Sequence, residues 1–258
     1  MTDLVRLEVR GRVAVLTLNR PERLNAISRA LLEELLARAH ELARNPDVRA
    51  AVVTGSGKAF AAGADIAEMR GFGPAEAEEF SRLGHRAFGA LEELAIPTIA
   101  AVQGVALGGG CELACACDWV YASRQARFGQ PEVKLGLIPG FGGTSRLARR
   151  VGPAWAKELV LNGEPIGPIV ARRIGLVNRV CEEEGVVEEA IATGEKVAER
   201  GPLAVAAAKR LIHQGQDADA RVAHALEQAA FGQIFASEDR VEGIEAFLAK
   251  RPPRFQGR

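Results

Sequence analysis

The chain has 258 residues, of which 48% are hydrophobic and 26% are charged, values typical of one large globular domain or of one domain with a small appendage. Its 33 basic and 33 acidic residues cancel, which argues against a partner recognised by overall charge, such as a nucleic acid or an anionic membrane. The first residues lack the pattern of a secretory leader, and no long apolar run predicts a membrane span, so the sequence predicts a soluble cytoplasmic protein.

The first half of the chain alternates strand and helix patterns. Residues 4–10 and 13–19 predict a hairpin, because two strand-like runs flank Gly11-Arg12. Ser28 is the expected N-cap of a helix that ends before Asn45-Pro46. The other elements predicted in this half are a buried strand at 49–54, a helix from about 74 to 94, a strand that runs on from residue 101, a short helix after 110 and a strand at 119–122.

Two glycine-rich turns each join a strand to a helix. One is Lys58-Ala59-Phe60-Ala61-Ala62-Gly63-Ala64-Asp65-Ile66, where Asp65 can cap the helix that follows; the other contains Gly108-Gly109-Gly110. The start of a helix presents unpaired N–H groups and the positive end of the helix dipole, which stabilise a negatively charged oxygen. If donors from both turns meet at one oxygen, they form an oxyanion hole.

Two glutamates are candidate acid–base residues. Glu112 lies in the first turn of the helix after the glycines, where its carboxylate can point at the same oxygen site. The alternative is an ordinary turn in which Glu112 only complements the helix dipole. Glu132 lies in an apolar loop rich in glycine and proline, where burial would raise the pKa of its carboxyl, as a general acid requires. The alternative for Glu132 is a surface-loop glutamate.

From residue 144 onward the pattern is almost wholly helical, apart from a short strand predicted at 176–181. The predicted helices are 144–151, 153–161, 168–174, 186–200, 202–214, 217–236 and 239–249. The last helices carry an apolar stripe broader than one small core needs, which predicts burial against a neighbouring subunit or over the first domain. Its members are Leu226, Ala230, Phe231, Ile234 and Phe235.

The cysteines and histidines show no metal-ligand spacing. Cys111 and Cys115 share a helical face while Cys117 points elsewhere, and the chain has no CxxC pair. The cysteines are therefore predicted to be small buried hydrophobes. The four histidines lie in helical patterns without ligand spacing, so no zinc site is expected.

Several stretches match a known family in the same order along the chain. They are Asn19-Arg20-Pro21 with Asn25-Ala26, the two glycine-rich stretches 58–66 and 104–113, the run Pro131-Glu132-Val133-Lys134-Leu135-Gly136-Leu137-Ile138-Pro139-Gly140, and 238–243 with 247–251. A single match of this kind is weak, but together they cover nearly the whole chain. The sequence thus closely resembles the enoyl-CoA hydratase (crotonase) family.

The resemblance implies an α/β fold, a crotonase-like superhelix of repeated strand-strand-helix units over residues 1–195. Residues 196–258 would form a helical region that assembles a homotrimer, or a hexamer made from two trimers. The ligand implied is a coenzyme A thioester whose carbonyl oxygen lies between the N–H groups of Ala64 and Gly109. The CoA thioester is the substrate, and no cofactor or metal is implied. The implied substrate- and CoA-binding residues are Arg23, Lys58, Ala61, Ala62, Asp65, Ile66 and Gly140.

Membership of the fold leaves the reaction open, because the superfamily also contains isomerases, dehalogenases, hydrolases, decarboxylases and ring-forming synthases. Hydratases of the family carry two glutamates, and both are present here. The resemblance therefore implies that ionised Glu112 deprotonates a water that attacks C3 of a trans-2-enoyl-CoA, while Glu132 protonates C2. The product is a 3-hydroxyacyl-CoA, as in fatty-acid β-oxidation. The preferred acyl chain would depend mainly on residues 66–90.

Two alternatives stay open. An enoyl-CoA isomerase, which commonly keeps only one of the two acids, is the main enzymatic alternative. The non-enzymatic alternative is an RNA-binding or scaffold protein on the same fold. Neutral net charge counts against RNA binding, although Arg146, Arg149 and Arg150 could form a local basic patch.

Overall fold

The computed structural model describes residues 3–182 and 185–258. Within these residues a six-stranded sheet has the strand order β1-β2-β3-β4-β6-β8, and a second sheet pairs β5 with β7. The strands are β1 (Val5–Arg10), β2 (Val13–Leu18), β3 (Ala50–Gly55), β4 (Thr98–Val102), β5 (Val105–Leu107), β6 (Trp119–Ser123), β7 (Arg127–Gly129) and β8 (Arg179–Cys181). The hairpin β1–β2 is antiparallel, and the other pairs are parallel.

The helices connect these strands and extend the chain beyond the sheets. They are α1 (Arg29–Ala43), α2 (Ile66–Met69), α3 (Pro74–Glu92), α4 (Gly109–Ala116), α5 (Ala148–Asn162), α6 (Pro168–Arg173), α7 (Val186–Ala198), α8 (Pro202–Gly215), α9 (Ala220–Ile234) and α10 (Glu238–Leu248). The expected N-cap of α1 is confirmed, because the Ser28 side chain accepts a hydrogen bond from the Leu31 N–H. The Asp65 side chain caps α2 in the same way.

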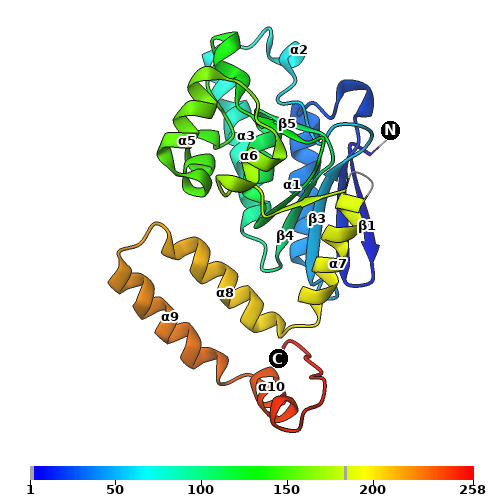
Figure 1. Cartoon of the computed structure of the whole chain (residues 1–258), viewed down its shortest axis with the longest axis vertical. Helices are drawn as coiled ribbons and strands as arrows, with labels where there is room; N and C mark the ends of the chain where they lie inside the picture. The colour runs from blue at the N-terminus through cyan, green and yellow to red at the C-terminus, as the bar shows by residue number, and fades with distance from the viewer. Residues whose placement is uncertain (1–2, 183–184) are drawn as a thin grey trace.

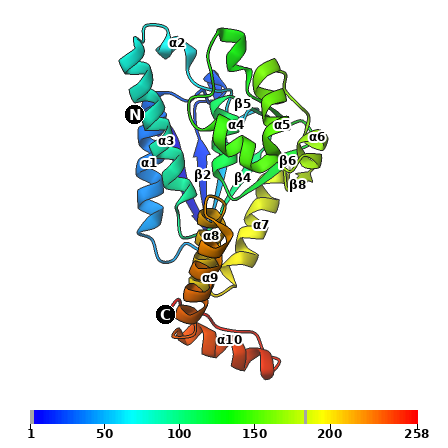
Figure 2. The ribbon, with the colours of Figure 1, turned by 90° about the vertical axis from the view of Figure 1, so that its left-hand side faces the viewer.

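The main sheet is buried on both faces, which explains why its strands are apolar at successive positions. In β2, Ala14, Leu16 and Leu18 belong to the core under α1 and α3. Val13 and Val15 alternate with them and belong to the core under α7. Figure 2 shows α1 and α3 on one side of the sheet and α7 on the other. A run such as Ala-Ala-Val-Val therefore supplies side chains to two separate cores.

Successive turns of the chain repeat one unit. After β2, β3, β4 and β6, the chain adds a short segment to an inner ladder before its next helix. Ile27 bridges to Ala64, Ala61 bridges to Ala106, and Phe128 bridges to Ile166, while β5 pairs with β7. This stacking of strand-strand-helix units confirms the predicted superhelix.

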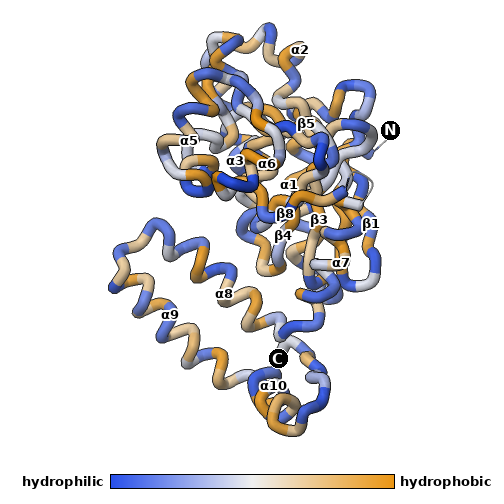
Figure 3. The backbone as a smooth tube through the Cα atoms, in the orientation of Figure 1, coloured by the Kyte–Doolittle hydropathy of each residue, from blue (hydrophilic) through white to orange (hydrophobic). Residues whose placement is uncertain are grey.

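The last three helices extend away from the sheets (Figure 1). Helix α8 packs against α9, and hydrophobic residues recur along both (Figure 3). Three members of the predicted apolar stripe, Leu226, Phe231 and Phe235, are exposed, with Phe231 at 67%, whereas Ala230 is buried. Phe247 of α10 is 82% exposed. No other part of the chain covers these exposed side chains within the described residues. Exposed apolar side chains of this kind are typical of a surface that packs against another chain.

Two details differ from the predictions made from sequence. The strand expected at 176–181 begins only at Arg179, because the N–H groups of Leu176 and Val177 donate to the Ala171 carbonyl of α6 and not to a strand. A π-helix occupies Gly143–Leu147. The predicted break near residue 152 is confirmed, since Gly152 has φ 77° inside α5 and precedes Pro153. No helix among the described residues is both long and apolar enough to cross a bilayer.

Candidate active site

The three consecutive glycines have three different structural roles. Gly108 has φ 49°, the left-handed region that favours glycine, and makes the turn from β5 into α4. Gly110 lies against another backbone, because a Cβ there would come within 2.1 Å of the Ala61 carbonyl oxygen. Gly109 is already helical, and a Cβ there would meet the Phe141 ring at 3.1 Å. The strained backbone angle therefore belongs to Gly108, and a side chain at Gly109 is opposed by crowding.

Two residues at the glycine-rich turns, Ala64 and Gly109, line one cavity. The residues on either side of Ala64 pair with Ile27: the Ile27 N–H donates to the Gly63 carbonyl, and the Asp65 N–H donates to the Ile27 carbonyl. The Ala64 N–H itself donates to no other backbone group of the described residues. The N–H of Gly109, the first residue of α4, has no partner within its helix. Both residues line a cavity of about 150 Å³ that also contains Glu112 and Glu132.

Glu112 is held rigidly in the wall of this cavity. Only 1% of its surface is exposed. Its Oε1 accepts hydrogen bonds from the backbone N–H groups of Phe141, at 2.8 Å, and Gly143, at 2.7 Å. Neither bond goes to Oε2, which leaves that oxygen to bind a water or a proton.

The pKa of Glu112 is raised to about 7. Burial is the main cause, because it disfavours the charged carboxylate. The N–H groups of Gly143 and Phe141 oppose the rise, and the negative charge of Glu132 adds to it. A carboxyl with a pKa near 7 can exchange a proton with water at neutral pH, as a general base requires.

Glu132 faces the cavity from the 3₁₀ helix Pro131–Leu135. Its carboxylate lies against the glycine turn, since a Cβ on Gly108 would come within 2.7 Å of Glu132 Oε1. Burial raises the pKa of Glu132. With its amide nitrogen turned toward Glu132, the fully buried Gln130 donates to Oε1 at 3.0 Å and to Oε2 at 3.3 Å. The structure thus brings both predicted acid–base residues and both predicted N–H donors to one cavity.

The rest of the cavity lining is mostly apolar. It includes three of the predicted substrate-binding residues, Ala62, Ile66 and Gly140. Met69, Ala77, Phe80 and Ser81 of the 66–90 region also line it. Phe141 packs edge-on against Phe80, with ring centroids 5.2 Å apart, and closes one wall.

Four of the seven predicted substrate- and CoA-binding residues lie outside the lining of this cavity, and two of them, Ala61 and Asp65, have structural partners instead. Ala61 is buried and bridges to Ala106 in the inner ladder. The Asp65 carboxylate caps α2 and accepts a hydrogen bond from Arg20 at 3.0 Å. Burial alone would raise the pKa of Asp65, but the bonds from Arg20 and from the Glu68 N–H outweigh it and lower that pKa. Both residues shape the loop that presents the Ala64 N–H.

The predicted basic residues Arg23 and Lys58 stand on adjoining loops. Both are exposed, and the two loops touch where a Cβ on Gly57 would come within 3.2 Å of Pro21. The buried Asn25 ties them together, since its side chain donates to the carbonyls of Ser56 and Ala59. Two exposed cations therefore flank the 58–66 turn, and neither makes an ion pair within the described residues.

The other polar clusters offer no comparable site. All four cysteines are free and buried, as the sequence predicted. Among the described residues no group of three or more His, Cys, Asp or Glu side chains could hold a metal ion. The arginine patch considered from the sequence is not free: Arg146 pairs with Glu92, Arg149 pairs with Asp217, and Arg150 donates to the carbonyls of Cys115 and Cys117.

Sequence reasoning missed the groups that support the two glutamates. They are the Gln130 side chain, the N–H groups of Phe141 and Gly143, and Arg146. The Gly-Phe-Gly-Gly run at 140–143 was the available signal, because a glycine-rich segment can turn its N–H groups toward an anion. The partner of such a segment is distant in sequence and is visible only in the fold.

Comparisons with known proteins agree with this geometry. The profile of the family described as enoyl-CoA hydratase/isomerase matches residues 8–258. The chain is 46% identical to a short-chain-enoyl-CoA hydratase of Clostridium acetobutylicum, over 95% of this chain and 94% of that protein. It is 44% identical to a crotonyl-CoA hydratase of Syntrophomonas wolfei, over 96% of each. A crystal structure of an enoyl-CoA hydratase from Bacillus anthracis superposes with a TM-score of 0.96 at 36% identity, covering 99% of this chain and all of that one.

Proposed function

Because the chain belongs to the enoyl-CoA hydratase/isomerase family and is an enoyl-CoA hydratase, we propose that Glu112 and Glu132 carry its reaction between two backbone donors. Water adds across the 2,3 double bond of a trans-2-enoyl-CoA and gives a 3-hydroxyacyl-CoA. The observation that carries this proposal is the meeting of Glu112, Glu132, Ala64 and Gly109 at one small cavity.

Glu112 acts as the base. Its Oε1 is fixed by two N–H groups, so Oε2 takes the proton of a bound water while the water oxygen bonds to C3. The electron pair of the double bond moves toward C2 and the thioester carbonyl. A positioned base of this kind contributes roughly 10²- to 10⁴-fold to the rate.

The developing negative charge falls on the thioester oxygen. The N–H groups of Ala64 and Gly109 are placed to bind it, and the dipole of α4 points its positive end at the same place. Such donors stabilise the transition state more than the neutral substrate. Removal of one donor of this type costs about 10²- to 10³-fold in rate.

Glu132 acts as the acid. Burial raises the pKa of Glu132, which favours the protonated carboxyl that the transfer to C2 requires. The negative enolate beside it raises that proton affinity further. After the addition Glu112 holds the proton taken from water and Glu132 is ionised, and exchange with solvent restores both.

The substrate class follows from the size of the cavity. A volume of about 150 Å³, closed by Phe141 and Phe80, suits a short acyl chain. The CoA moiety extends toward the exposed cations Arg23 and Lys58, whose charges suit its phosphates. A cytoplasmic location stays a prediction from the sequence.

The exposed apolar side chains of α9 and α10 support a homo-oligomer, a trimer or a hexamer of two trimers. Phe231 and Phe247 are exposed, and exposed apolar side chains on one surface are typical of an interface. The helices that carry them extend away from the sheets, where a second copy could cover them (Figure 1).

Loss of the conjugated absorbance of crotonyl-CoA tests the activity directly. We expect rapid hydration of crotonyl-CoA and slower hydration of long-chain enoyl-CoA substrates in the same assay. Isomerisation of a 3-enoyl-CoA without hydration of crotonyl-CoA would contradict the proposal. Salt-sensitive binding of RNA without hydration would favour the scaffold alternative instead.

A further inference from the structure

The loop that holds Glu112, residues 141–143, has only its end in a regular element: Gly143 begins a π-helix, and the Gly142 carbonyl accepts hydrogen bonds from the N–H groups of Ser145 and Arg146. Phe141 and Gly143, whose N–H groups bind Glu112 Oε1, lie on either side of Gly142, which has φ 109°. The segment lies outside both sheets and leads into the π-helix Gly143–Leu147. Glycine-rich loops of this kind lose much conformational entropy when they are fixed. Contacts from elsewhere must therefore hold the two N–H groups in place.

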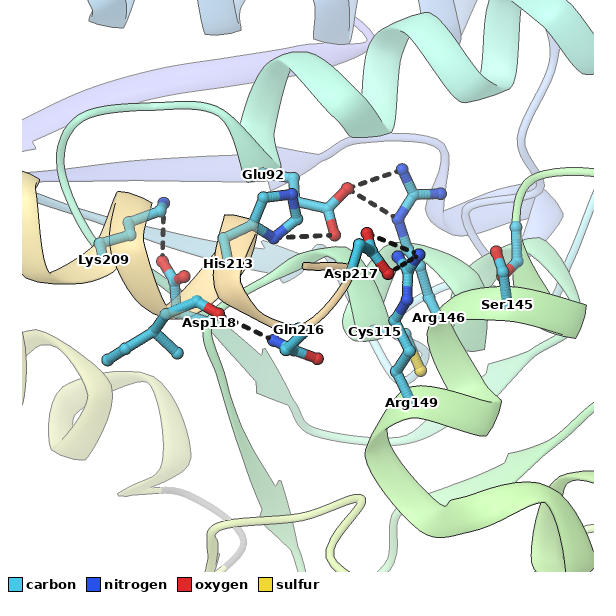
Figure 4. Close-up of polar contacts among 12 residues, drawn as sticks. Glu92, Cys115, Asp118, Ser145, Arg146, Arg149, Lys209, His213, Gln216 and Asp217 are labelled. Atoms are coloured by element: carbon cyan, nitrogen blue, oxygen red, sulfur yellow. Dashed lines mark hydrogen bonds and ion pairs between the residues drawn. The ribbon is translucent and has the colours of Figure 1, made fainter. Parts of the chain in front are cut away.

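The Phe141 ring packs on Phe80 and Phe88, and Arg146 supplies the polar contact to the loop backbone. Its Nη1 donates to the Phe141 carbonyl oxygen at 2.8 Å. Its Nε and Nη2 donate to Glu92 Oε2, at 3.0 Å and 2.8 Å. The two side chains are only 11% and 18% exposed. One guanidinium thus connects the loop to the end of α3, as Figure 4 shows for Arg146 and Glu92.

The glycine at position 142 is part of the same contact. A Cβ there would come within 2.2 Å of Arg146 Nη1, so the guanidinium lies directly on the loop backbone. Arg146 binds the carbonyl of Phe141, and the N–H of the same residue binds Glu112. These two backbone groups lie on either side of the Phe141 Cα. Displacement of the guanidinium would therefore move a hydrogen-bond donor of the proposed base.

We propose that Arg146, anchored by Glu92, is a positioning residue that holds the 141–143 loop against Glu112 and so fixes the orientation of the base. The inference rests on the proposed role of Glu112 and goes beyond it. Glu92 and Arg146 are 54 positions apart in sequence, which is why no local motif indicates the pair.

The charge of Arg146 adds to the geometric effect. It lowers the pKa of Glu112, against the larger rise due to burial. The other ionisable groups around Glu112 are Cys111 and Cys115 on its own helix and Glu132 opposite. The ionisable groups around Arg146 are Glu92 and His85 on α3 and His213 on α8. The Nδ1 atom of His213 lies 3.9 Å from Glu92 Oε1. Loss of the Arg146 charge therefore has a predictable sign: it raises the pKa of the base.

The test compares Arg146→Gln and Arg146→Lys with a matched control, Arg149→Gln. Arg149 also donates to a carboxylate, that of Asp217. Both Arg146 and Arg149 line a cavity of about 570 Å³ between α8 and the sheets. The side-chain hydrogen bonds of Arg149 within the described residues go to Asp217 and not to the 141–143 loop. Crotonyl-CoA hydration is measured against pH, with kcat normalised to sites titrated with 3-hydroxybutyryl-CoA.

For Arg146→Gln we expect kcat to fall about 10- to 100-fold, the range for a displaced catalytic group, with little change in product affinity. The acidic limb of the pH profile, which is the range over which kcat falls as the pH is lowered, should move to higher pH. Arg146→Lys should restore the limb, because it restores the charge, while recovering only part of kcat. Arg149→Gln should match the wild type in kcat and in the limb.

Two further variants keep the inference falsifiable if Arg146→Gln fails to fold. Glu92→Gln keeps the guanidinium charge but weakens its anchor, so kcat should fall without an upward shift of the limb. In a Glu112→Gln background, Arg146→Lys should cost almost nothing further, since the group it positions is gone. Wild-type kcat in Arg146→Gln and Glu92→Gln, or an equal loss in Arg149→Gln, would overturn the inference alone. Wild-type hydration by Glu112→Gln would instead overturn the proposed function.

Discussion

The rate of hydration should rise with pH across neutrality, because the proposed base has a pKa of about 7. Glu112 must be ionised to take a proton from water. A carboxyl whose pKa is raised is protonated below that pKa, so activity is lost as the pH falls through 7. An ordinary glutamate, with a pKa near 4.3, would be fully ionised over the same range.

The size of the effect follows from the fraction of Glu112 that is ionised. For a pKa of about 7 that fraction is roughly 9% at pH 6, 50% at pH 7 and 91% at pH 8. The value of kcat/KM for crotonyl-CoA should therefore rise about five- to sixfold from pH 6 to pH 7, and less than twofold from pH 7 to pH 8. Burial raises the pKa of Glu132 as well. Because Glu112 and Glu132 interact, the apparent pKa values of the profile belong to the pair of carboxyl groups and not to one residue.

The assay is the initial rate of crotonyl-CoA hydration at subsaturating substrate, from pH 5.5 to pH 9 at constant ionic strength. Preincubation at each pH followed by assay at pH 8 separates titration from irreversible inactivation. A flat profile between pH 5.5 and pH 8, in an enzyme that keeps its activity through preincubation, would refute a base with a raised pKa.

Two other predictions concern the glycine turn and the assembly. Gly109→Val should lower kcat at least 100-fold in a folded protein. The new Cβ would meet Phe141 at 3.1 Å and Ile27 at 3.2 Å, and the valine methyl groups would crowd the oxyanion donor. Wild-type turnover in a variant with a native circular dichroism spectrum would exclude Gly109 as a donor. Light scattering at micromolar concentration should give the mass of three or six chains, because Phe231 and Phe247 are exposed in one chain; a stable monomer would contradict the proposed assembly.

The main elements of the fold could be predicted because their signals are local. A strand such as β3 is apolar on both faces, and Ser28 and Asp65 both cap helices as their positions in the sequence predicted. Both glutamates could be singled out from the residues around them, since Glu112 follows three glycines and Glu132 lies among glycine and proline. Their meeting in one cavity with Ala64 and Gly109 depends on the stacking of successive turns, and spacing alone does not determine it.

The supporting contacts were beyond the sequence for a physical reason. Arg146 looked like part of an exposed basic helix face, yet it is 11% exposed and paired with Glu92. Asp65 was expected along the path of CoA, yet its carboxylate is bound by Arg20 and by α2. In both cases a charged side chain is neutralised by a partner far along the chain. No periodicity or local motif reports such a pair.

The central claim is that two carboxyl groups, separable from binding, carry out the hydration. Its most direct test is the rate of crotonyl-CoA hydration by Glu112→Gln, Glu132→Gln and the double variant, with the affinity for 3-hydroxybutyryl-CoA measured for each. Glutamine is nearly isosteric with glutamate but neither takes nor gives the proton. Each single variant should lose several orders of magnitude in rate and bind product nearly as the wild type does, and the double variant should lose far less than the product of the two effects. Near-wild-type hydration by Glu112→Gln would contradict the two-carboxylate mechanism.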